Sequence, residues 1–336
     1  MDPQDRFSVL IVAFRSRDTV PECLAALARQ TRPADEVWVL ENGSPQGERL
    51  VSSDMPDDLP GLRFVESDTN LGFAGGNNHL ARDAQGDWLV LLNPDAFASV
   101  DWLERLEAAT RTYRDVGLFG CTQTAAGHAG VLDGTGDVYH LAGLAYRSGY
   151  GRSEEHRPPT GEVFGPCGAM TLIRRELFER LGGFDESFFC YNEDVDLAFR
   201  ARAIGERAIQ LSEPDVAHLG YASSGRRSEF ATYHGVRNRA WVFMKNMPGW
   251  ALWVLAPLHI GLTVLMWLSA YRFGLGSVFA RAIRDAWADR ERVWKQRREI
   301  QAKRVVAVWP FLRMMAWNPI RLLTRASHIR PLKPRE

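Results

Sequence analysis

The chain has 336 residues, 46% of them hydrophobic and 11% aromatic, so it can bury a sizeable core and is not an intrinsically disordered protein. Its formal net charge is zero, yet residues 272–336 carry 16 Lys and Arg against 5 Asp and Glu, while residues 1–271 carry 25 against 36. A basic segment on an acidic body predicts an anionic partner for that segment, either membrane lipid or nucleic acid.

Short apolar runs alternate with helical patterns through the first third of the chain. Four runs are short enough for buried parallel strands, at residues 7–14, 36–40, 62–65 and 88–92. Helical patterns follow the first and the third of these runs. The alternation predicts an α/β fold with right-handed crossovers, in which helices cover both faces of a doubly wound, mostly parallel sheet. Residues 122–162 are polar and Gly-rich, and we expect an insertion of short strands and loops there.

Polar loops are expected at the carboxyl ends of these strands, where open α/β sheets bind their ligands. The loop at 70–78 holds three glycines, so its backbone can approach a ligand closely, and the following helix start offers N–H groups to an anion. Asp95 follows the fourth strand, and one carboxylate together with substrate phosphates is a common way of holding Mg²⁺ or Mn²⁺. A plain turn at the glycines and a helix cap at Asp95 are the alternative interpretations.

Three carboxylates, on Glu193, Asp194 and Asp196, fall at the start of an amphipathic helical pattern. A helix start stabilises ionised carboxylates through its free N–H groups and its partial positive charge. An ionised Asp at the mouth of a cleft could accept a proton from a hydroxyl group, although helix capping explains the same residues equally well. His218 follows a short apolar run and is either a metal ligand or a structural residue.

Together and in this order, these segments resemble the bacterial family 2 glycosyltransferases, in particular their rhamnosyltransferase-like branch. The resemblance covers roughly residues 7–245. The matching segments are 7–14 with Asp18, 33–44, 70–78, 91–95, 168–170, 182–186, 193–197, His218, and Tyr233 with Arg237-Asn238-Arg239. Each piece is common by itself, whereas their co-occurrence is specific.

The resemblance implies a GT-A fold and an inverting transfer from a nucleoside diphosphate sugar, with dTDP-rhamnose as the expected donor. It implies a divalent metal, Mg²⁺ or Mn²⁺, on Asp95 and His218, with Asp194 as catalytic base and Glu193 as its acceptor-side partner. The residues expected to contact the nucleotide are Ala13, Phe14, Glu41, Asn42, Gly72, Phe73, Gly75, Gly76, Asn77 and Asn93. The acceptor would be a hydroxyl group of a cell-surface polysaccharide or a lipid-linked glycan, and Asp196 would be structural.

Two other functions compete with this one. A sugar-nucleotide pyrophosphorylase would need a Gly-rich loop with Lys or Arg after the first strand, and Phe14-Arg15-Ser16 does not supply it. A catalytically silent, membrane-associated scaffold of the same shape would not need both Asp95 and Asp194. We therefore expect an enzyme, a metal-dependent hexosyltransferase.

The chain changes character after about residue 232, since eight of the eleven tryptophans lie beyond Ala240. We expect a GT-A catalytic domain at 1–232 and a helical, basic, Trp-rich region at 233–336. Residues 246–271 contain no charged side chain apart from His259, and their length could span a bilayer. A single span would, however, separate a cytosolic catalytic body from a basic segment that also belongs inside. Pro257 and Gly261 should also disturb a straight helix there.

We therefore expect in-plane or re-entrant contact of this segment with the membrane, followed by a basic amphipathic helix. The enzyme would then work in the cytoplasm, at the cytoplasmic face of the inner membrane. Packing against the catalytic domain or a second subunit, which would make the protein a homo-oligomer, is the alternative. Nucleic acid is not expected as a partner, because the basic residues alternate with apolar ones as in membrane helices. The four cysteines form no Cys-x-x-Cys pair, which argues against zinc and fits a reducing cytosol.

Overall fold

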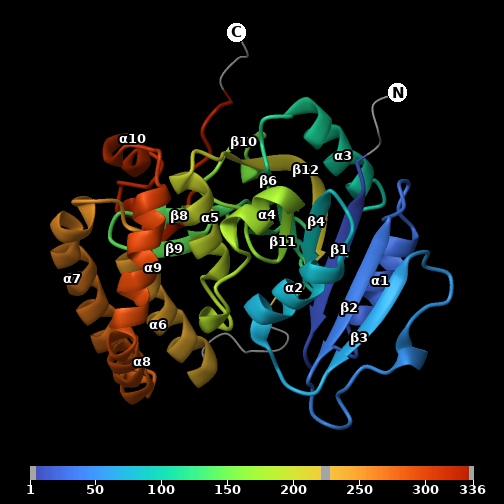
Figure 1. Ribbon diagram of the computed structural model, residues 1–336, viewed down its shortest axis with the longest axis horizontal. Coiled ribbons are helices and arrows are strands. Elements are labelled where there is room, and N and C mark those ends of the chain that lie inside the picture. The colour runs from blue at the N-terminus through green and yellow to red at the C-terminus, as the bar shows by residue number, and fades with distance from the viewer. Residues whose placement is uncertain (1–4, 221–227, 333–336) are drawn as a thin grey trace.

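The computed structural model describes residues 5–220 and 228–332 (Figure 1). The N-terminal part consists of β1 (Phe7–Ala13), α1 (Val20–Ala28), β2 (Glu36–Asn42), η1 (Ser52–Asp54), β3 (Leu62–Ser67), α2 (Gly72–Asp83), β4 (Trp88–Leu92), β5 (Ala96–Ala98) and α3 (Trp102–Thr112). The middle part consists of β6 (Leu118–Ala125), β7 (Leu132–Gly134), β8 (Asp137–His140), β9 (Leu144–Arg147), η2 (Glu154–His156), β10 (Gly161–Glu162), β11 (Met170–Arg174), α4 (Arg175–Leu181), η3 (Glu186–Phe188), α5 (Glu193–Ala203) and β12 (Ala208–His218). The C-terminal part is helical: α6 (Glu229–Asn246), α7 (Ala251–Tyr271), α8 (Gly276–Ala288), α9 (Arg290–Lys303), α10 (Val308–Leu312) and α11 (Ile320–Thr324).

The central sheet has the strand order β10-β12-β6-β11-β4-β1-β2-β3, with β5 and β7 paired at its margin to β12 and β6. β1 is parallel to β2 and β4, and β2 is parallel to β3. β11 is antiparallel to its neighbours β4 and β6, while β12 is parallel to β6. The predicted α/β fold with a mostly parallel sheet is therefore confirmed, and β11 is a reversed strand inside it.

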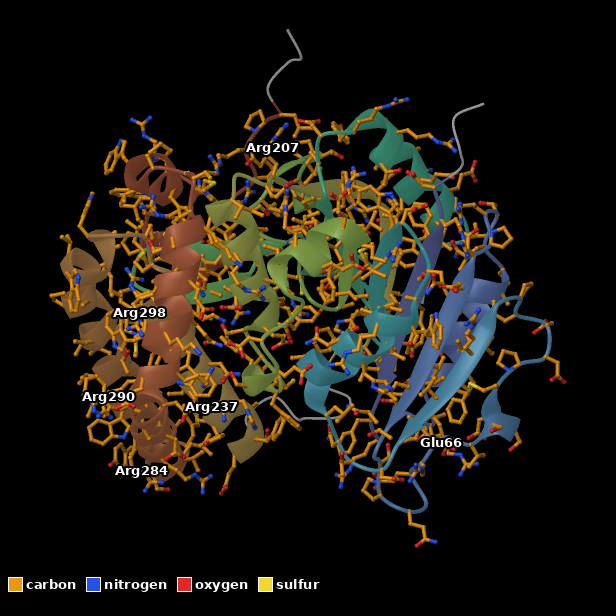
Figure 2. All side chains as sticks on the ribbon, in the orientation of Figure 1. Glu66, Arg207, Arg237, Arg284, Arg290 and Arg298 are labelled. Atoms are coloured by element: carbon orange, nitrogen blue, oxygen red, sulfur yellow. The ribbon has the colours of Figure 1, made fainter. Side chains whose placement is uncertain are left out.

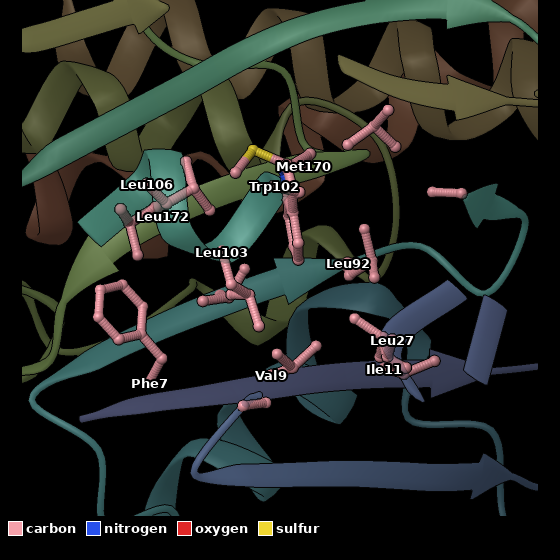
Figure 3. Close-up of a cluster of buried hydrophobic side chains, with 14 of the residues drawn as sticks. Phe7, Val9, Ile11, Leu27, Leu92, Trp102, Leu103, Leu106, Met170 and Leu172 are labelled. Carbon is pink, nitrogen blue, oxygen red and sulfur yellow. The ribbon is translucent and has the colours of Figure 1, made fainter. Parts of the chain in front are cut away.

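Successive residues of β1 pack against opposite faces of this sheet. Val9 and Ile11 join Trp102 and Leu106 of α3 in one cluster, which also includes residues of α1 (Figure 3). Leu10 lies on the other face, in a cluster with residues of α2, α4 and α5. Helices thus cover both faces, which explains why the parallel strands are continuous apolar runs without alternation. Their carboxyl ends remain open for a site.

The C-terminal helices share a hydrophobic cluster with the middle part of the chain. Phe164 and Phe199 pack there with Trp241 of α6 and Phe311 of α10. The ring of Phe199 lies 4.7 Å from that of Phe164 and 5.8 Å from that of Phe311 between centroids. The domain boundary predicted after residue 232 falls inside α6. The division into two domains stays a prediction, and α6 must be considered together with α5, against which it packs.

α7 is the one helix, among the described residues, that is long and apolar enough to cross a membrane, with a mean hydropathy of 1.9 over its most apolar window. Only 17% of that window is buried, although the core helix of a soluble protein would be mostly buried. The helix continues through Pro257 and Gly261, the residues expected to disturb a straight helix there. Proline costs a helix one hydrogen bond, to the carbonyl group of Trp253 here, and that residue is exposed.

Candidate active site

A cavity of about 500 Å³ opens at the carboxyl ends of β1, β2 and β4. Seven of the residues predicted for the site line it: Phe14, Asn42, Gly72, Phe73, Asn93, Asp95 and His218. A larger cavity of about 1040 Å³ is lined mainly from α2, α4, residues 182–186 and α9, and contains none of the predicted site residues. The smaller cavity is therefore the candidate site, because the chemically suited side chains converge there.

Asn42, the last residue of β2, shapes the floor of this cavity. Its Oδ1 accepts a hydrogen bond from the backbone N–H of Leu71 at 2.9 Å. Its Nδ2 donates to the carbonyl oxygen of Gly72 at 3.2 Å and to Oδ1 of Asn70 at 3.1 Å. These three bonds fix the turn that leads into α2. Asn42 thereby sets the position of the Gly72–Phe73 wall.

Ala13 and Glu41 belong to the same strand ends but do not line the cavity. Glu41 is buried, and its two carboxylate oxygens accept backbone N–H groups of Ser44 at 2.6 Å and of Leu50 at 2.9 Å. The carboxylate thus holds the segment that follows β2. Nucleotide contact by these two residues has no support in this geometry, because Ala13 is fully buried and Glu41 is used inside the protein.

The glycines predicted to form a loop at 72–77 are helical instead, because α2 begins at Gly72. Gly75, Gly76 and Asn77 are buried in its first turns and do not line the cavity. A Cβ at Gly76 would lie 2.6 Å from Cγ1 of Val12, so glycine lets α2 approach β1 closely. The loop prediction was wrong because tertiary packing overrides the low helix propensity of glycine here. Only Gly72 and Phe73 of this segment face the cavity.

Asp95 and His218, which are 123 positions apart in sequence, pair at the wall of the cavity. Nε2 of His218 lies 3.3 Å from Oδ1 of Asp95 and 3.3 Å from Nδ2 of Asn93. The other carboxylate oxygen of Asp95 accepts the N–H of Gly220 at 3.1 Å. Burial alone would raise the pKa of Asp95, but the hydrogen bond and charge of His218 outweigh it, so the pKa falls below its ordinary value. Asp95 therefore presents an ionised carboxylate at this wall.

A second carboxylate orients His218 from behind. Nδ1 of His218 lies 2.8 Å from Oδ2 of Asp133, a buried residue of β7. Metal-binding histidines commonly have such a carboxylate partner, which fixes the tautomer of the ring. No group of three His, Cys, Asp or Glu side chains suited to a metal occurs within 5–220 and 228–332. Asp95 and His218 fit a divalent ion whose remaining ligands are phosphate oxygens and water.

The acidic helix α5 begins at Glu193, as predicted. Asp194 accepts two backbone N–H groups, from Gly168 to Oδ2 at 2.9 Å and from Val195 to Oδ1 at 2.8 Å. Burial raises its pKa above the ordinary value in spite of these bonds. Glu193 is buried, its Oε2 has no hydrogen-bond partner, and burial together with the charge of Asp194 raises its pKa strongly.

Asp196 has a different environment. It is fully buried and bonded to Lys245 at 3.0 Å and to Nδ2 of Asn246 at 2.7 Å, so it joins α5 to α6 as a structural residue. Neither Glu193 nor Asp194 lines the cavity, which at this side ends at Cys190 and Tyr191. The structure brings the predicted metal ligands together and places the acidic helix directly after the cavity wall.

Asp137 is a further carboxyl group beside Asp194 that the sequence did not indicate. The two side chains share a hydrogen bond, and burial, then the charge of Asp194, raises the pKa of Asp137 far above its ordinary value. Because Asp194 also accepts two backbone N–H groups and the pKa of Asp137 is raised well above its ordinary value, Asp137 is the better placed of the two to carry a proton. Arg147 of β9, which lies opposite Asp137 in the β8–β9 pair, lines the cavity and donates a hydrogen bond to Asp133.

Comparison with known proteins shows the family to which the chain belongs. A model described as Glycosyl transferase family 2 matches residues 8–182. The chain is 29% identical to the O-antigen biosynthesis protein RfbC of Myxococcus xanthus over 66% of its own length, but it spans only 18% of that larger protein. It is also 29% identical to N-acetylglucosaminyl-diphospho-decaprenol L-rhamnosyltransferase of Mycobacterium tuberculosis, over 68% of this chain and 82% of the relative.

Solved structures show the same fold. The mannosyltransferase PcManGT of Pyrobaculum calidifontis, solved with GDP-Man and Mn²⁺, superposes with a TM-score of 0.51 at 18% identity, over 90% of this chain and 86% of its own. This likeness confirms the GT-A fold. It extends over the C-terminal helices as well as the sheet.

Proposed function

Because the chain belongs to glycosyltransferase family 2, we propose that it transfers a sugar from a nucleoside diphosphate donor to a hydroxyl group, with inversion at the anomeric carbon. The observation that carries the proposal is the Asp95–His218 pair on the wall of a cavity at the carboxyl end of β4. This is where an open α/β sheet binds a nucleotide.

The donor would lie against the cavity residues Phe14, Asn42, Gly72, Phe73 and Asn93. Phe14 and Phe73 offer apolar surface, while Asn93 offers an amide group beside His218. A Mg²⁺ or Mn²⁺ ion held by Asp95 and His218 would neutralise the charge of the diphosphate leaving group. Gly75, Gly76, Asn77, Ala13 and Glu41 would support this wall from behind, since they do not face the cavity.

Asp194 is the proposed base that accepts the proton of the acceptor hydroxyl group as its oxygen attacks the anomeric carbon. Two backbone N–H groups hold the carboxylate in one orientation. Asp137, whose pKa is raised well above its ordinary value, would hold a proton beside Asp194 and so favour its ionised form. Glu193 would face the acceptor side, where a buried carboxyl oxygen without a partner could bond an acceptor hydroxyl group.

Rhamnose from dTDP-rhamnose is the proposed donor, and a cell-surface polysaccharide or lipid-linked glycan the proposed acceptor. The name of the mycobacterial relative, an L-rhamnosyltransferase that acts on a diphospho-decaprenol, supports both choices. The RfbC relative is named for O-antigen biosynthesis, which is consistent with an envelope glycan.

A lipid-linked acceptor would bring this enzyme to the cytoplasmic face of a membrane. The exposed apolar side chains of α7 include Trp253, Val254 and Leu265, each more than 60% exposed. Arg284 of α8 and Arg290 and Arg298 of α9 lie on the side of the molecule formed by the C-terminal helices, which include α7 (Figure 2). Apolar and basic groups on one side would bind an anionic lipid surface, with α7 in its plane.

A donor screen tests the proposal. Purified protein with Mg²⁺ or Mn²⁺ is incubated with each common nucleotide sugar, and nucleoside diphosphate release is measured with and without prenyl-diphosphate-linked glycan. We expect the protein to release nucleoside diphosphate from dTDP-rhamnose, and the release to increase when the acceptor is present. Absence of release with every donor would contradict the proposal and favour a silent scaffold, whereas consumption of pyrophosphate would favour a pyrophosphorylase.

A further inference from the structure

The four residues ahead of α5 have an unusual backbone. Five non-glycine residues within 5–220 and 228–332 have a φ angle in the left-handed region, and three of them are Phe189 at 65°, Tyr191 at 71° and Asn192 at 66°. Such conformations cost on the order of 1–3 kcal/mol each and persist only where surrounding contacts over-determine them. Some other part of the protein must therefore hold this segment.

The side chain of Asn238, in the middle of α6, holds it. Its Nδ2, whose two hydrogens are shared among three acceptors, lies 2.9 Å from the carbonyl oxygen of Phe188, 2.8 Å from that of Cys190 and 2.7 Å from that of Tyr191. Its Oδ1 accepts from Nε of Arg237 at 3.0 Å, which fixes the orientation of the amide. Asn238 is fully buried, so no water can replace these bonds without an opening of the structure.

The segment held by Asn238 forms part of the site. Phe189, Cys190 and Tyr191 line the cavity, and Asn192 is the N-cap residue directly before α5. Asp194 is the second residue of that helix. A relaxed backbone at Phe189 to Asn192 would therefore move both the cavity wall and the proposed base.

α6 does not need Asn238 to stay in place. Lys245 of the same helix bonds Asp185 at 2.7 Å and Asp196 at 3.0 Å. The indole N–H of Trp241 donates to the carbonyl oxygen of Ala286 in α8 at 3.2 Å. Loss of the Asn238 amide should consequently release the 188–192 segment while the helix keeps its packing.

We propose that Asn238 is a positioning residue for glycosyl transfer, acting through the 188–192 segment on the Asp194 carboxylate and on the cavity wall. The inference rests on the proposed function, since it assumes that Asp194 takes the acceptor proton. It predicts that the catalytic step depends on α6, although this helix contributes no side chain to the proposed chemistry.

The test replaces Asn238 by leucine, which has a similar volume and no donor, and by serine, which keeps one donor. Gln30→Leu is the matched control, because Gln30 is also a buried amide with backbone bonds, to Ala26 at 3.2 Å, Ser99 at 2.7 Å and Leu103 at 3.0 Å. Measurements are kcat for transfer, Kd for the nucleoside diphosphate with metal, and hydrogen exchange of the amides at 189–195.

Asn238→Leu should lower kcat about 10- to 100-fold, the cost of a misplaced catalytic group, and weaken nucleoside diphosphate binding by a smaller factor, because only part of the cavity wall moves. Amide exchange at 189–195 should speed up, and Asn238→Ser should recover part of kcat. Gln30→Leu should lose stability without a comparable loss of kcat per folded molecule. If Asn238→Leu matched the control in kcat and in exchange at 189–195, the inference would be overturned. A wild type inactive with every donor would instead refute the proposed function, and this inference with it.

Discussion

The Asp194 carboxylate lies directly against the backbone of Gly168. Its Oδ2 accepts the Gly168 N–H at 2.9 Å, and a Cβ built on Gly168 would also lie 2.9 Å from this oxygen. Real Cβ atoms essentially never approach a heavy atom so closely, so any larger residue at 168 must push the carboxylate away. Because residue 168 is glycine, the proposed base has room to bond the backbone just ahead of β11.

Gly168→Ala should therefore displace the Asp194 carboxylate while leaving the donor wall of the cavity intact. We expect kcat for transfer to fall about 10- to 100-fold, because small misplacements of a catalytic group have costs of this size. Nucleoside diphosphate affinity, measured by calorimetry, should stay within about twofold. An unchanged kcat would mean that the carboxylate needs no such placement.

Removal of the Asp133 carboxylate, which lies behind His218, should weaken metal binding although Asp133 would not contact the ion. Asp133→Asn is expected to lower Mn²⁺ affinity about 10- to 100-fold, the usual effect of such orienting partners. The measurement is Mn²⁺ binding in the presence of nucleoside diphosphate, followed by electron paramagnetic resonance. Asp95→Ala should weaken binding further, because it removes the ionised ligand.

Asp215→Asn is the control for this experiment. Asp215 is also a paired aspartate, with two bonds to Arg157 at 2.6 and 2.7 Å, but it does not line the cavity. Equal Mn²⁺ affinity in wild type and Asp133→Asn would refute the metal role of His218.

Lys245 should stabilise the protein in a pH-dependent manner. It neutralises Asp185 and Asp196, whose pKa values burial would raise but the Lys245 charge lowers below the ordinary range. Lys245→Met should cost up to about 3–5 kcal/mol at pH 7, because it removes the cation shared by two buried carboxylates, of which Asp196 keeps its ion pair with Arg200 at 2.8 Å. Carboxylates with lowered folded pKa values stabilise above their unfolded pKa of about 4, and this stability is lost as the pH falls through the folded values.

Urea unfolding at pH 7 and at pH 3 checks this. The difference in the free energy of unfolding between wild type and Lys245→Met should be smaller at pH 3, where the carboxyl groups of the unfolded chain are mostly protonated. A difference that is equal at both pH values would show that the ion pairs are not its source.

The exposed face of α7 should bind lipid. The side chains of Trp253, Val254 and Leu265 would each contribute about 1.5–3 kcal/mol on burial, so replacing all three by serine should abolish flotation with phosphatidylglycerol vesicles. Val100→Ser, at a residue 56% exposed on the sheet domain, is the control and should float like wild type. Salt should weaken flotation by screening the basic groups. Failure of the wild type to float at low salt would contradict membrane contact.

The strands and the position of the acidic helix could be predicted from the sequence, because buried parallel strands are continuous apolar runs and α5 starts with acidic residues. The pairing of Asp95 with His218 could not be derived from spacing and came from the family resemblance. The continuous helix at Gly72 was missed, because contact with Val12 outweighs the conformational cost of its glycines.

Asp133, Asp137 and Arg147 were missed for another reason. They lie on β7, β8 and β9, strands of three or four residues inside the segment predicted only as an insertion. Strands this short show no readable periodicity, and their partners, His218 and Asp194, are distant in the sequence. Only the folded structure reveals that the insertion supplies the polar groups behind both proposed catalytic features.

Asp194→Asn tests the central claim most directly, since it keeps the shape of the side chain and removes the base. With donor and acceptor saturating, kcat should fall about 10²- to 10⁴-fold, the usual contribution of general base catalysis. Wild-type activity should be lost as the pH falls through the raised pKa of Asp194, above the ordinary range of Asp, and the mutant should lack this limb. Transfer by Asp194→Asn at a rate near that of wild type, with the same pH profile, would contradict the account.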